Sequence, residues 1–420
     1  MKKQCYPIIF TLFVFLISFN TQAQKKNLTE EEKAYLKKFI YPLKSVEPEY
    51  PEVSDLKIFD NLIGTSKIVA LGEVSHGSSE IYKMKDRLVR YLIPNNNFSI
   101  FSLEASMPES YMMNEFTMNG EGDPKVFLEG MKFWIWQTEE MLSIVNWIKK
   151  YNETGSRQVQ FTGFDMLYTG GAIEEIKKIC TVNSFPQDDI TQLSEVIKAI
   201  DEQSNGKSKK TNITSDQKET LNILLENLKL FSRKIKDEKE KNWFLQNLRI
   251  IEQNTDKSAM KRDLYMAQNI GWIHSQNPDA RMIVSAHNGH ISNYKAKMGE
   301  YLKRDLKNDY TTFGFTFYSG NYTAFDQKSR TVGSFPAQTA YEGTAEYLLN
   351  SLDIPIFVLD LKSLRQENSE AARWITRDEI RFRRTGSTVV SEEFQKTNIS
   401  ADFDYLIFIK ESAHSRLLEK

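Results

Sequence analysis

The chain lacks an excess of charge of either sign, and it has very little cysteine. Its 420 residues carry a formal net charge of −1, without a long block of like charges. It therefore lacks the basic surface that nucleic-acid binding requires, and we expect no nucleic-acid partner. Its only two cysteines are Cys5 and Cys180. No internal repeat or low-complexity tract is present.

The N-terminal segment has the pattern of a secretory signal peptide. Lys2-Lys3 precede the apolar run Tyr6–Phe19, which is too short for a confident membrane span, and a small residue precedes the expected cut at Ala23-Gln24. We predict a signal peptide over residues 1–23 and a mature chain over 24–420, periplasmic or secreted, without stable membrane association. An uncleaved anchor is the alternative. Cleavage leaves one cysteine, which excludes an internal disulfide even in an oxidising compartment.

Composition and length indicate a soluble globular protein. Hydrophobic residues make up 40% of the chain and charged residues 26%. The length suits one large domain with an insertion, or two ordinary domains. The 26 Phe, 18 Tyr and 6 Trp suit a large core or a bulky apolar ligand.

Apolar runs of strand length recur along the chain and predict an α/β core. We expect strands at Lys67–Glu73, Phe98–Glu104, Gln158–Gly163, Ala280–Ala286, Tyr310–Phe317, Ile354–Leu361 and Tyr405–Ile409. The helix Ser78–Ile93, ended by Pro94, joins the first two strands as a βαβ unit. Residues 106–152 are expected to be helical, and residues 171–272 to form a charged helical insertion. The order predicts a mostly parallel central sheet flanked by helices.

Three of the five histidines lie in two short segments, each directly after a predicted strand. These segments are Leu71-Gly72-Glu73-Val74-Ser75-His76-Gly77 and Ala286-His287-Asn288-Gly289-His290. The carboxyl ends of parallel strands meet at one edge of a sheet, where open α/β folds bind ligands. The two segments therefore predict a reaction centre.

The residues of this centre suit acid–base chemistry. His76 can accept a proton from water near neutral pH, and Gly77 beside it is expected to let the backbone approach a ligand. Glu73 and Glu104 end the first two predicted strands, so they could orient an imidazole if those strands are neighbours. Asp165 ends the third strand in the same way.

Two histidines and an arginine from other segments are further candidates for the same centre. His287 and His290 are three residues apart, a spacing that puts both on one face of a helical turn. Arg262 can supply a fixed positive charge for a developing oxyanion. His274 and His414 are expected to be structural or exposed.

Two other chemistries fit less well. A serine nucleophile at Ser75 would need glycines two residues before and after it, and Glu73 occupies the first of these positions. A zinc site built from His76, His287, His290 and a glutamate is chemically possible, but its spacing matches no strong metal signature. We predict no metal and no cofactor, and a metal-dependent hydrolase stays as an alternative.

At these residues the chain resembles the erythromycin esterase family. The matching segments are Gly72–Gly77, Leu103-Glu104, Phe133–Trp136 with Glu139-Glu140, Gly163–Asp165, Arg262-Asp263 with Met266–Asn269, and Ala286–His290. They extend in order from about residue 60 to residue 320, and the resemblance fades toward the C-terminus.

The resemblance implies an α/β core with a helical lobe and a deep cleft between them. Known members open the macrolactone ring of 14-membered macrolides such as erythromycin, which confers resistance to these antibiotics. They are regarded as working without a metal, with a histidine that activates water. Carried over to this chain, His76 would be the general base, and Glu73 and Glu104 would orient it or the water.

The remaining roles follow from the same resemblance. His287 and Arg262 would polarise the ester carbonyl or stabilise the oxyanion, and His290 and Asp165 would support them. Substrate-binding or supporting roles are expected for Trp134, Trp136 and Asn288. The expected partner is a small-molecule ester. An envelope or metabolite ester is an alternative substrate, and a binding or transfer protein without chemistry is the alternative class.

Overall fold

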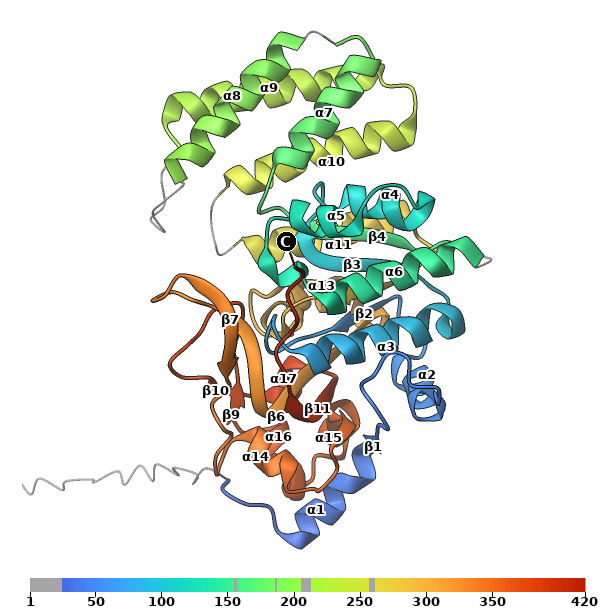
Figure 1. The fold of residues 1–420 in the computed structure, drawn as a ribbon, viewed down its shortest axis with the longest axis vertical. Coiled ribbons are helices and arrows are strands. Elements are labelled where there is room, and N and C mark those ends of the chain that lie inside the picture. The colour runs from blue at the N-terminus through green and yellow to red at the C-terminus, as the bar shows by residue number, and fades with distance from the viewer. Residues whose placement is uncertain (1–24, 155–156, 186, 205–212, 257–260, 420) are drawn as a thin grey trace, which may run out of the picture.

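The computed structural model describes residues 25–154, 157–185, 187–204, 213–256 and 261–419 (Figure 1). The strands are β1 (Ile40–Pro42), β2 (Ile68–Leu71), β3 (Phe98–Ser106), β4 (Gln160–Asp165), β5 (Arg281–Ser285), β6 (Tyr310–Asp326), β7 (Thr331–Pro336), β8 (Ile356–Asp360), β9 (Ile380–Arg383), β10 (Phe394–Thr397) and β11 (Tyr405–Ser412). The helices are α1 (Glu30–Leu36), α2 (Ile58–Ile63), α3 (Ser79–Asn96), α4 (Tyr111–Asn119), α5 (Pro124–Gly130), α6 (Glu139–Thr154), α7 (Gly170–Val182), α8 (Gln187–Ser204), α9 (Ser215–Phe231), α10 (Glu238–Thr255), α11 (Arg262–Gln276), α12 (Asn288–Ile291), α13 (Met298–Leu306), α14 (Ala345–Asn350), α15 (Leu361–Glu367), α16 (Arg373–Thr376) and α17 (Ile399–Asp402).

A central sheet organises the described part of the chain. Nine strands form it in the order β1-β8-β11-β6-β2-β5-β3-β4, with β7 paired to β6. The pairs from β11 to β4 are parallel, whereas β8, β1 and β7 are added antiparallel. The predicted fold class, a mostly parallel sheet flanked by helices, is confirmed. All seven predicted strands are present, and β6 extends beyond its predicted end because it forms a hairpin with β7.

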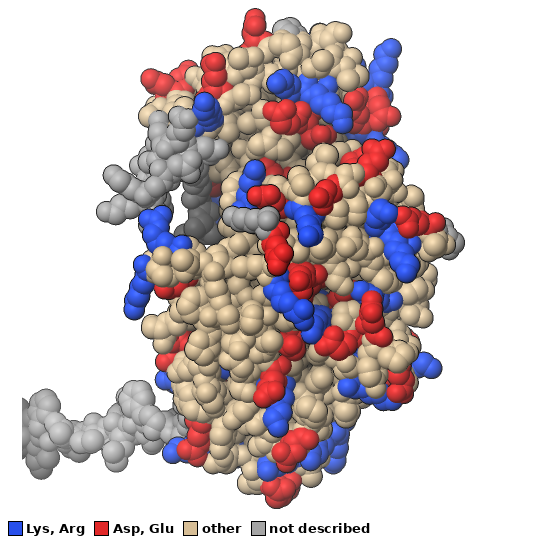
Figure 2. Space-filling model, viewed as in Figure 1, with Lys and Arg blue, Asp and Glu red and all other residues tan. Residues whose placement is uncertain are grey.

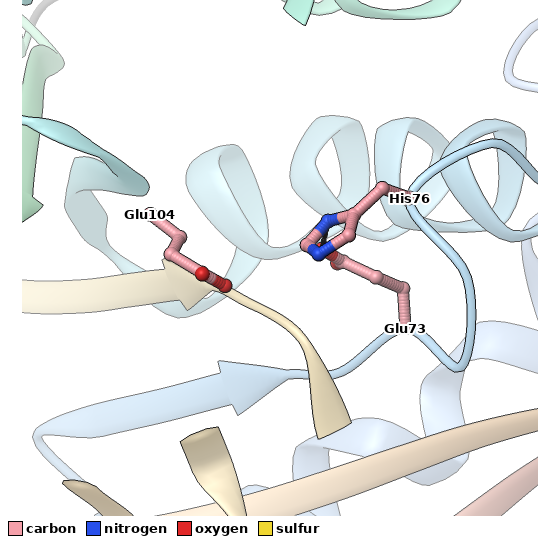
Figure 3. A group of neighbouring side chains, drawn as sticks. All are labelled: Glu73, His76 and Glu104. Atoms are coloured by element: carbon pink, nitrogen blue, oxygen red, sulfur yellow. Dashed lines mark ion pairs between the residues drawn. The ribbon is translucent and has the colours of Figure 1, made fainter. Parts of the chain in front are cut away.

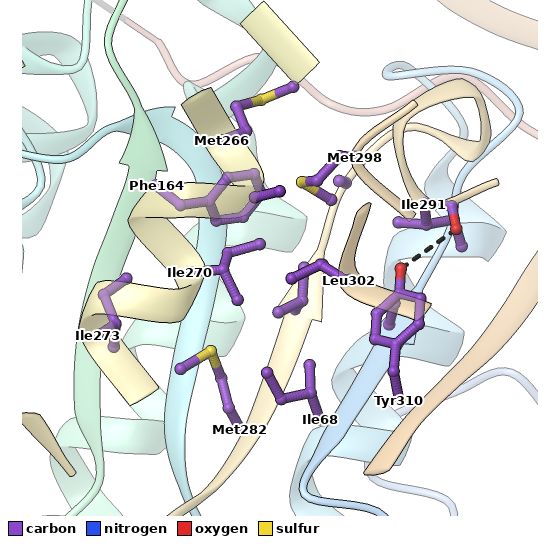
Figure 4. Packing of buried hydrophobic residues seen from close by; sticks show 14 of the residues in the cluster. Ile68, Phe164, Met266, Ile270, Ile273, Met282, Ile291, Met298, Leu302 and Tyr310 are labelled. Carbon is purple, nitrogen blue, oxygen red and sulfur yellow. Dashed lines mark hydrogen bonds between the residues drawn. The ribbon is translucent and has the colours of Figure 1, made fainter. Parts of the chain in front are cut away.

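Buried side chains form two hydrophobic clusters, one on each face of the sheet. Along β2, Ile68 and Ala70 belong to one cluster, and Val69 and Leu71 belong to the other. This alternation is what a strand buried on both faces requires. Figure 4 shows the first cluster, where side chains of α11 and α13 lie against those of the sheet. The second cluster includes side chains of α3 and α6.

One local expectation was wrong. The helix expected to end at Pro94 continues as α3 to Asn96, and Asn97, with a φ of 60°, follows as its left-handed cap. A proline removes only one backbone donor, which the last turn of a long helix tolerates. Whether β2 and β3 are neighbours was left open by the sequence. They are not, because β5 lies between them and pairs with both.

The helical segment after β4 has two parts. The helices α7 to α10 lie together at one end of the molecule, beyond α4 and α5 (Figure 1). The last helix of the segment, α11, instead packs against β4 and α13 beside the sheet. This position places the first residue of α11, Arg262, close to the carboxyl edge of the strands.

Basic and acidic side chains are interspersed over the face shown in Figure 2. Among the described residues, no helix combines the length and apolarity needed to cross a membrane. The predicted signal peptide, residues 1–23, lies outside the described residues.

Candidate active site

The structure brings the candidate residues together at the carboxyl edge of the parallel strands. That edge gathers Glu73 and His76 after β2, Glu104 in β3, Asp165 at the end of β4, His287 and His290 after β5, and Arg262 at the start of α11. Although β5 separates β2 from β3, the carboxylates of Glu73 and Glu104 lie in one cluster. Both residues come just after the last ones that pair with β5, Leu71 in β2 and Leu103 in β3.

His76 lies between two carboxylates (Figure 3). Its Nδ1 is 3.1 Å from Oε1 of Glu73, and side-chain nitrogen or oxygen atoms of Glu73, His76 and Glu104 all lie within 4.8 Å of one another. The ring contacts His287, at 5.2 Å between centroids, and the edge of Trp136, at 6.3 Å. Burial lowers the pKa of His76 to about 4, although the Glu104 carboxylate acts in the opposite direction. The imidazole is therefore neutral at pH 7 and can accept a proton.

Arg262 and His290 hold the second carboxylate. Nη2 of Arg262 donates to Oε1 of Glu104 at 3.0 Å, and its Nε donates to Oδ2 of Asp165 at 3.2 Å. Nε2 of His290 lies 3.2 Å from the same oxygen of Glu104. Nδ1 of His290 lies 2.8 Å from Oδ1 of Asp263. Each of these carboxylates therefore has a positively charged partner.

The pKa shifts of His290 and Glu104 agree with these ion pairs. Burial alone would lower the pKa of His290, but Glu104 and Asp263 raise it to about 9. Burial would likewise raise the pKa of Glu104, but His290 and Arg262 outweigh it and hold the pKa well below its usual value. His290 and Arg262 are thus both cations, and their close approach, 3.2 Å from Nε2 to Nη1, is tolerated because they share the Glu104 carboxylate.

His287 has a different environment from the other two imidazoles. Its Nε2 lies 2.9 Å from the carbonyl oxygen of Thr385, and its Nδ1 accepts a hydrogen bond from the backbone N–H of Gly289 at 3.1 Å. Its own backbone N–H donates to Glu104 at 2.8 Å. Burial, reinforced by the nearby His76, lowers the pKa of His287 to about 3. The ring is thus neutral, and both of its nitrogens are engaged by backbone groups.

Asn288 supports the site without facing it. Its side-chain amide donates to the carbonyl oxygen of Phe315 at 2.7 Å and accepts from the N–H of the same residue at 3.1 Å. The pair of bonds ties the turn after β5 to β6. Ser75 is fully buried, and its hydroxyl oxygen accepts from the N–H of Gly77.

Gly77 has another role than the one expected. A Cβ at this position would lie 1.9 Å from the carbonyl oxygen of Thr323 in β6. The residue is therefore needed for the close approach of another strand, and the expectation that it admits a ligand was wrong. Its carbonyl oxygen also accepts hydrogen bonds from the N–H groups of Thr323 and Ser415.

The tryptophan-rich segment forms part of the surroundings of His76. Trp136 is fully buried in the second hydrophobic cluster, with its ring at right angles to the imidazole. Trp134 is half-buried and packs against the same cluster. Both lie in a short 3-10 helix, Trp134–Trp136, that leads into α6.

Sequence reasoning missed three residues that belong to this network. Lys85 contacts Glu73 from α3, Asp263 pairs with His290, and Thr385 lies against His287. A signal was present for Lys85, because it lies four residues after Ile81 on the apolar face of the predicted helix. Asp263 lies in one of the segments that carry the family resemblance, but the sequence indicated no role for it. Thr385 lies two residues after β9, whose sequence is not an apolar run, so it had no signal.

Fold and site together define an α/β protein with a buried cluster of histidine, carboxylate and basic side chains at the carboxyl edge of its sheet. Comparisons with known proteins identify its family. A sequence model of erythromycin esterase matches residues 93–412, so the chain belongs to the erythromycin esterase family and is grouped with hydrolases of the esterase type.

The individual relatives have low sequence identity to this chain, but the matches cover most of both chains. The chain is 24% identical to the putative hydrolase YbfO of Bacillus subtilis, covering 89% of this chain and 92% of the relative. It is 23% identical to erythromycin esterase type II of Escherichia coli, with 87% and 94% covered. Among solved structures, a Bacillus cereus protein superposes with a TM-score of 0.79 at 23% identity, covering 93% of this chain and 99% of the other. A histidine-to-asparagine mutant of the erythromycin esterase EreC, in its open conformation, superposes with a TM-score of 0.68 at 17% identity, with 89% and 98% covered.

Proposed function

We propose that the protein hydrolyses the macrolactone ester of a macrolide with a water molecule that His76 activates. The observation that carries this proposal is the neutral imidazole of His76, buried between Glu73 and Glu104. A general base must be unprotonated at the working pH and close to a group that stabilises its protonated form. His76 meets both conditions.

His76, one water molecule and the ester account for every proton transfer and every bond change in the proposed hydrolysis. His76 takes a proton from water as the water oxygen bonds to the ester carbonyl carbon, which gives a tetrahedral oxyanion and an imidazolium. The carbon–oxygen bond to the alcohol then breaks, and the imidazolium returns its proton to the leaving oxygen. The products are a carboxylic acid and an alcohol, which in a macrolactone belong to one opened chain.

Arg262 and His290 supply the positive potential beside the forming charges. Both are cations, and both share Glu104. His287 was expected to polarise the carbonyl, but its engaged nitrogens favour a structural role that keeps the His76 ring in place. We therefore assign electrostatic stabilisation of the oxyanion to the Arg262–His290 pair.

We further propose that the reaction needs no metal ion. The atoms of Glu73, His76 and Glu104 are close enough to hold one, but both carboxylates already have basic side chains as partners. Lys85 contacts Glu73, while Arg262 and His290 bind Glu104. A divalent ion would have to compete with these charges in a site that gives them little solvent screening.

The macrolide is the first candidate among possible esters, because two of the matched relatives are named erythromycin esterases. The predicted export signal agrees with a periplasmic or secreted enzyme that meets the drug before it reaches the ribosome. An envelope or metabolite ester would use the same reaction centre.

Mass spectrometry of erythromycin after incubation with the purified protein tests this function. We expect a product heavier by one water, formed equally in the presence of a metal chelator. His76→Ala should abolish product formation, and the matched control His414→Ala, at an exposed position outside the site, should leave it unchanged. An unaltered macrolide across a panel of ring sizes would refute the substrate, and inhibition by the chelator would refute the metal-free mechanism.

A further inference from the structure

Lys85 is a lysine in a place where lysines are rarely found. Its side chain is completely buried in α3, and so is the side chain of Glu73 that it contacts. A buried ion pair contributes little net stability compared with apolar side chains of the same volume. Stability alone therefore gives no reason for a lysine here.

The contacts of Lys85 lead directly to the proposed base. Its Nζ contacts Oε2 of Glu73 and donates to Oγ of Ser285 at 2.9 Å. It also lies 5.0 Å from the centroid of the Tyr82 ring. The other carboxylate oxygen of Glu73, Oε1, is 3.1 Å from Nδ1 of His76. Lysine, carboxylate and imidazole thus form a continuous chain from the interior of α3 to the site.

We propose that Lys85 is a positioning residue that keeps Glu73 ionised and so fixes the proton of His76 on Nδ1. Nδ1 is buried and has no aligned hydrogen bond among the described residues, and Glu73 is the acceptor within its reach. An ionised Glu73 holds the proton there and leaves Nε2 as the nitrogen that accepts a proton from water. This inference rests on the proposed function.

Charged and titratable side chains from several elements surround Glu73. Lys85 and Tyr82 face it from α3, with the Tyr82 hydroxyl donating to Oε1 at 3.3 Å. His76 faces it from the loop after β2. Glu104 acts on these groups electrostatically from β3, and Glu140 acts on Tyr82. Burial lowers the pKa of Lys85, and the Glu104 carboxylate opposes that shift. Among the described residues, Lys85 is the one lysine or arginine side chain in direct contact with Glu73.

The test compares three substitutions by their pH–rate profiles. In Lys85→Met, Glu73 loses its counter-ion in a buried place, so its pKa rises and it is protonated at pH 7. We expect turnover at pH 7 to fall about a hundredfold and to recover as pH rises and Glu73 ionises. Lys85→Arg keeps the charge and should retain the profile shape of the unaltered enzyme. Lys83→Met, on the same helix with its ammonium paired to Glu47 at the surface, should change neither.

A double-substitution cycle separates positioning from folding. If Lys85 acts through Glu73, then Lys85→Met should cost little further activity in a Glu73→Gln background. A purely structural lysine would lower the melting temperature, leave the profile shape unchanged and reduce activity equally in both backgrounds. That result would overturn the inference.

A measurement without substrate distinguishes this inference from the proposed function. Carboxyl ¹³C NMR should show Glu73 ionised at pH 7 in the unaltered protein and protonated in Lys85→Met. Identical titrations would refute the role of Lys85 whatever the substrate is. Full activity of His76→Ala, by contrast, would refute the proposed function and leave the effect of Lys85 on Glu73 standing.

Discussion

At the scale of single residues, the site places three imidazoles in three different environments. Burial keeps His76 and His287 neutral, with pKa values of about 4 and about 3. His290 is somewhat more exposed than His76, and two carboxylates hold it as a cation with a pKa of about 9. In the mechanism that we propose, the same side chain serves as base, as structural group and as fixed charge, because its neighbours decide which form is stable.

The pH dependence of the rate should follow from these values. His76 accepts a proton only when it is neutral, so activity should be present above its pKa of about 4 and lost below it. His290 stabilises the oxyanion only while charged, so activity should decline again above about 9. Initial rates of ester hydrolysis should therefore be constant between about pH 6 and pH 8, whereas an ordinary histidine would titrate near 6.5.

His290→Gln supplies the matching control for the alkaline side. It should lower the rate and remove the decline above pH 9 that we assign to His290, without moving the acidic limb. An acidic inflection near 6.5 would show that His76 is solvated in the working enzyme and not buried as in this structure.

At the scale of elements, the loop after β2 is positioned by segments from the end of the chain. The carbonyl oxygen of Gly77 binds the N–H groups of Thr323 in β6 and of Ser415 beyond β11. The Thr323 hydroxyl also donates to the carbonyl oxygen of Ser415. The backbone of the loop that carries His76 is thus tied directly to β6 and to the C-terminal segment.

Gly77→Ala should disturb this junction. The added methyl group would lie 1.9 Å from the carbonyl oxygen of Thr323, so the loop and β6 must separate. We expect a loss of about 2 kcal/mol in the free energy of unfolding, together with reduced turnover because His76 moves with the loop. Urea unfolding followed by circular dichroism measures the first effect.

Gly271→Ala is the control for the same added methyl group. No atom lies within 4 Å of the position its Cβ would take, and the residue is inside α11. Helix propensity predicts a gain of about 1 kcal/mol there. Equal effects of the two substitutions would show that the contact with β6 does not constrain the loop.

The sequence predicted the elements better than their connections. Each of the seven predicted strands contains an apolar run, and each catalytic candidate except Arg262 lies at the end of such a strand or shortly after it, so the edge of the sheet could be located before the structure. The position of β5 between β2 and β3 depends on pairing between distant segments, which no local pattern encodes. The partner of Lys85 and the contact of Thr385 with His287 were hidden for the same reason.

At the scale of the whole molecule, the site depends on contacts across most of the chain. Its residues come from position 73 to position 385, and they are held by strands β2 to β6 and by the C-terminal segment. The helices α7 to α10 contribute buried side chains to the same hydrophobic cluster that lies under β2 and β5. A site built in this way should be lost when the global fold is lost, so its electrostatics also bear on global stability.

Acidification should destabilise the protein through its neutral histidines. Unfolding returns His76 and His287 to pKa values near 6.5, whereas the folded state holds them at about 4 and about 3. Their stabilising effect is therefore complete above about pH 6.5 and is lost as pH falls toward 4. His290 acts in the opposite direction, because its raised pKa of about 9 favours folding at lower pH, but between pH 7 and 5 its gain is only about 1 kcal/mol.

The sum is a net loss of about 3 kcal/mol in the free energy of unfolding from pH 7 to pH 5, which urea unfolding at the two pH values measures. In His76→Asn, which cannot titrate, about 2 kcal/mol of that difference should disappear. Carboxylates with lowered pKa values, Glu104 and Asp263 among them, act in the same direction and lose their contribution at still lower pH. Equal stability at pH 5 and pH 7 would mean that the histidines of the site gain protons as easily in the folded protein as in the unfolded chain. In that case neither the low pKa of His76 nor its role as a buried base could stand.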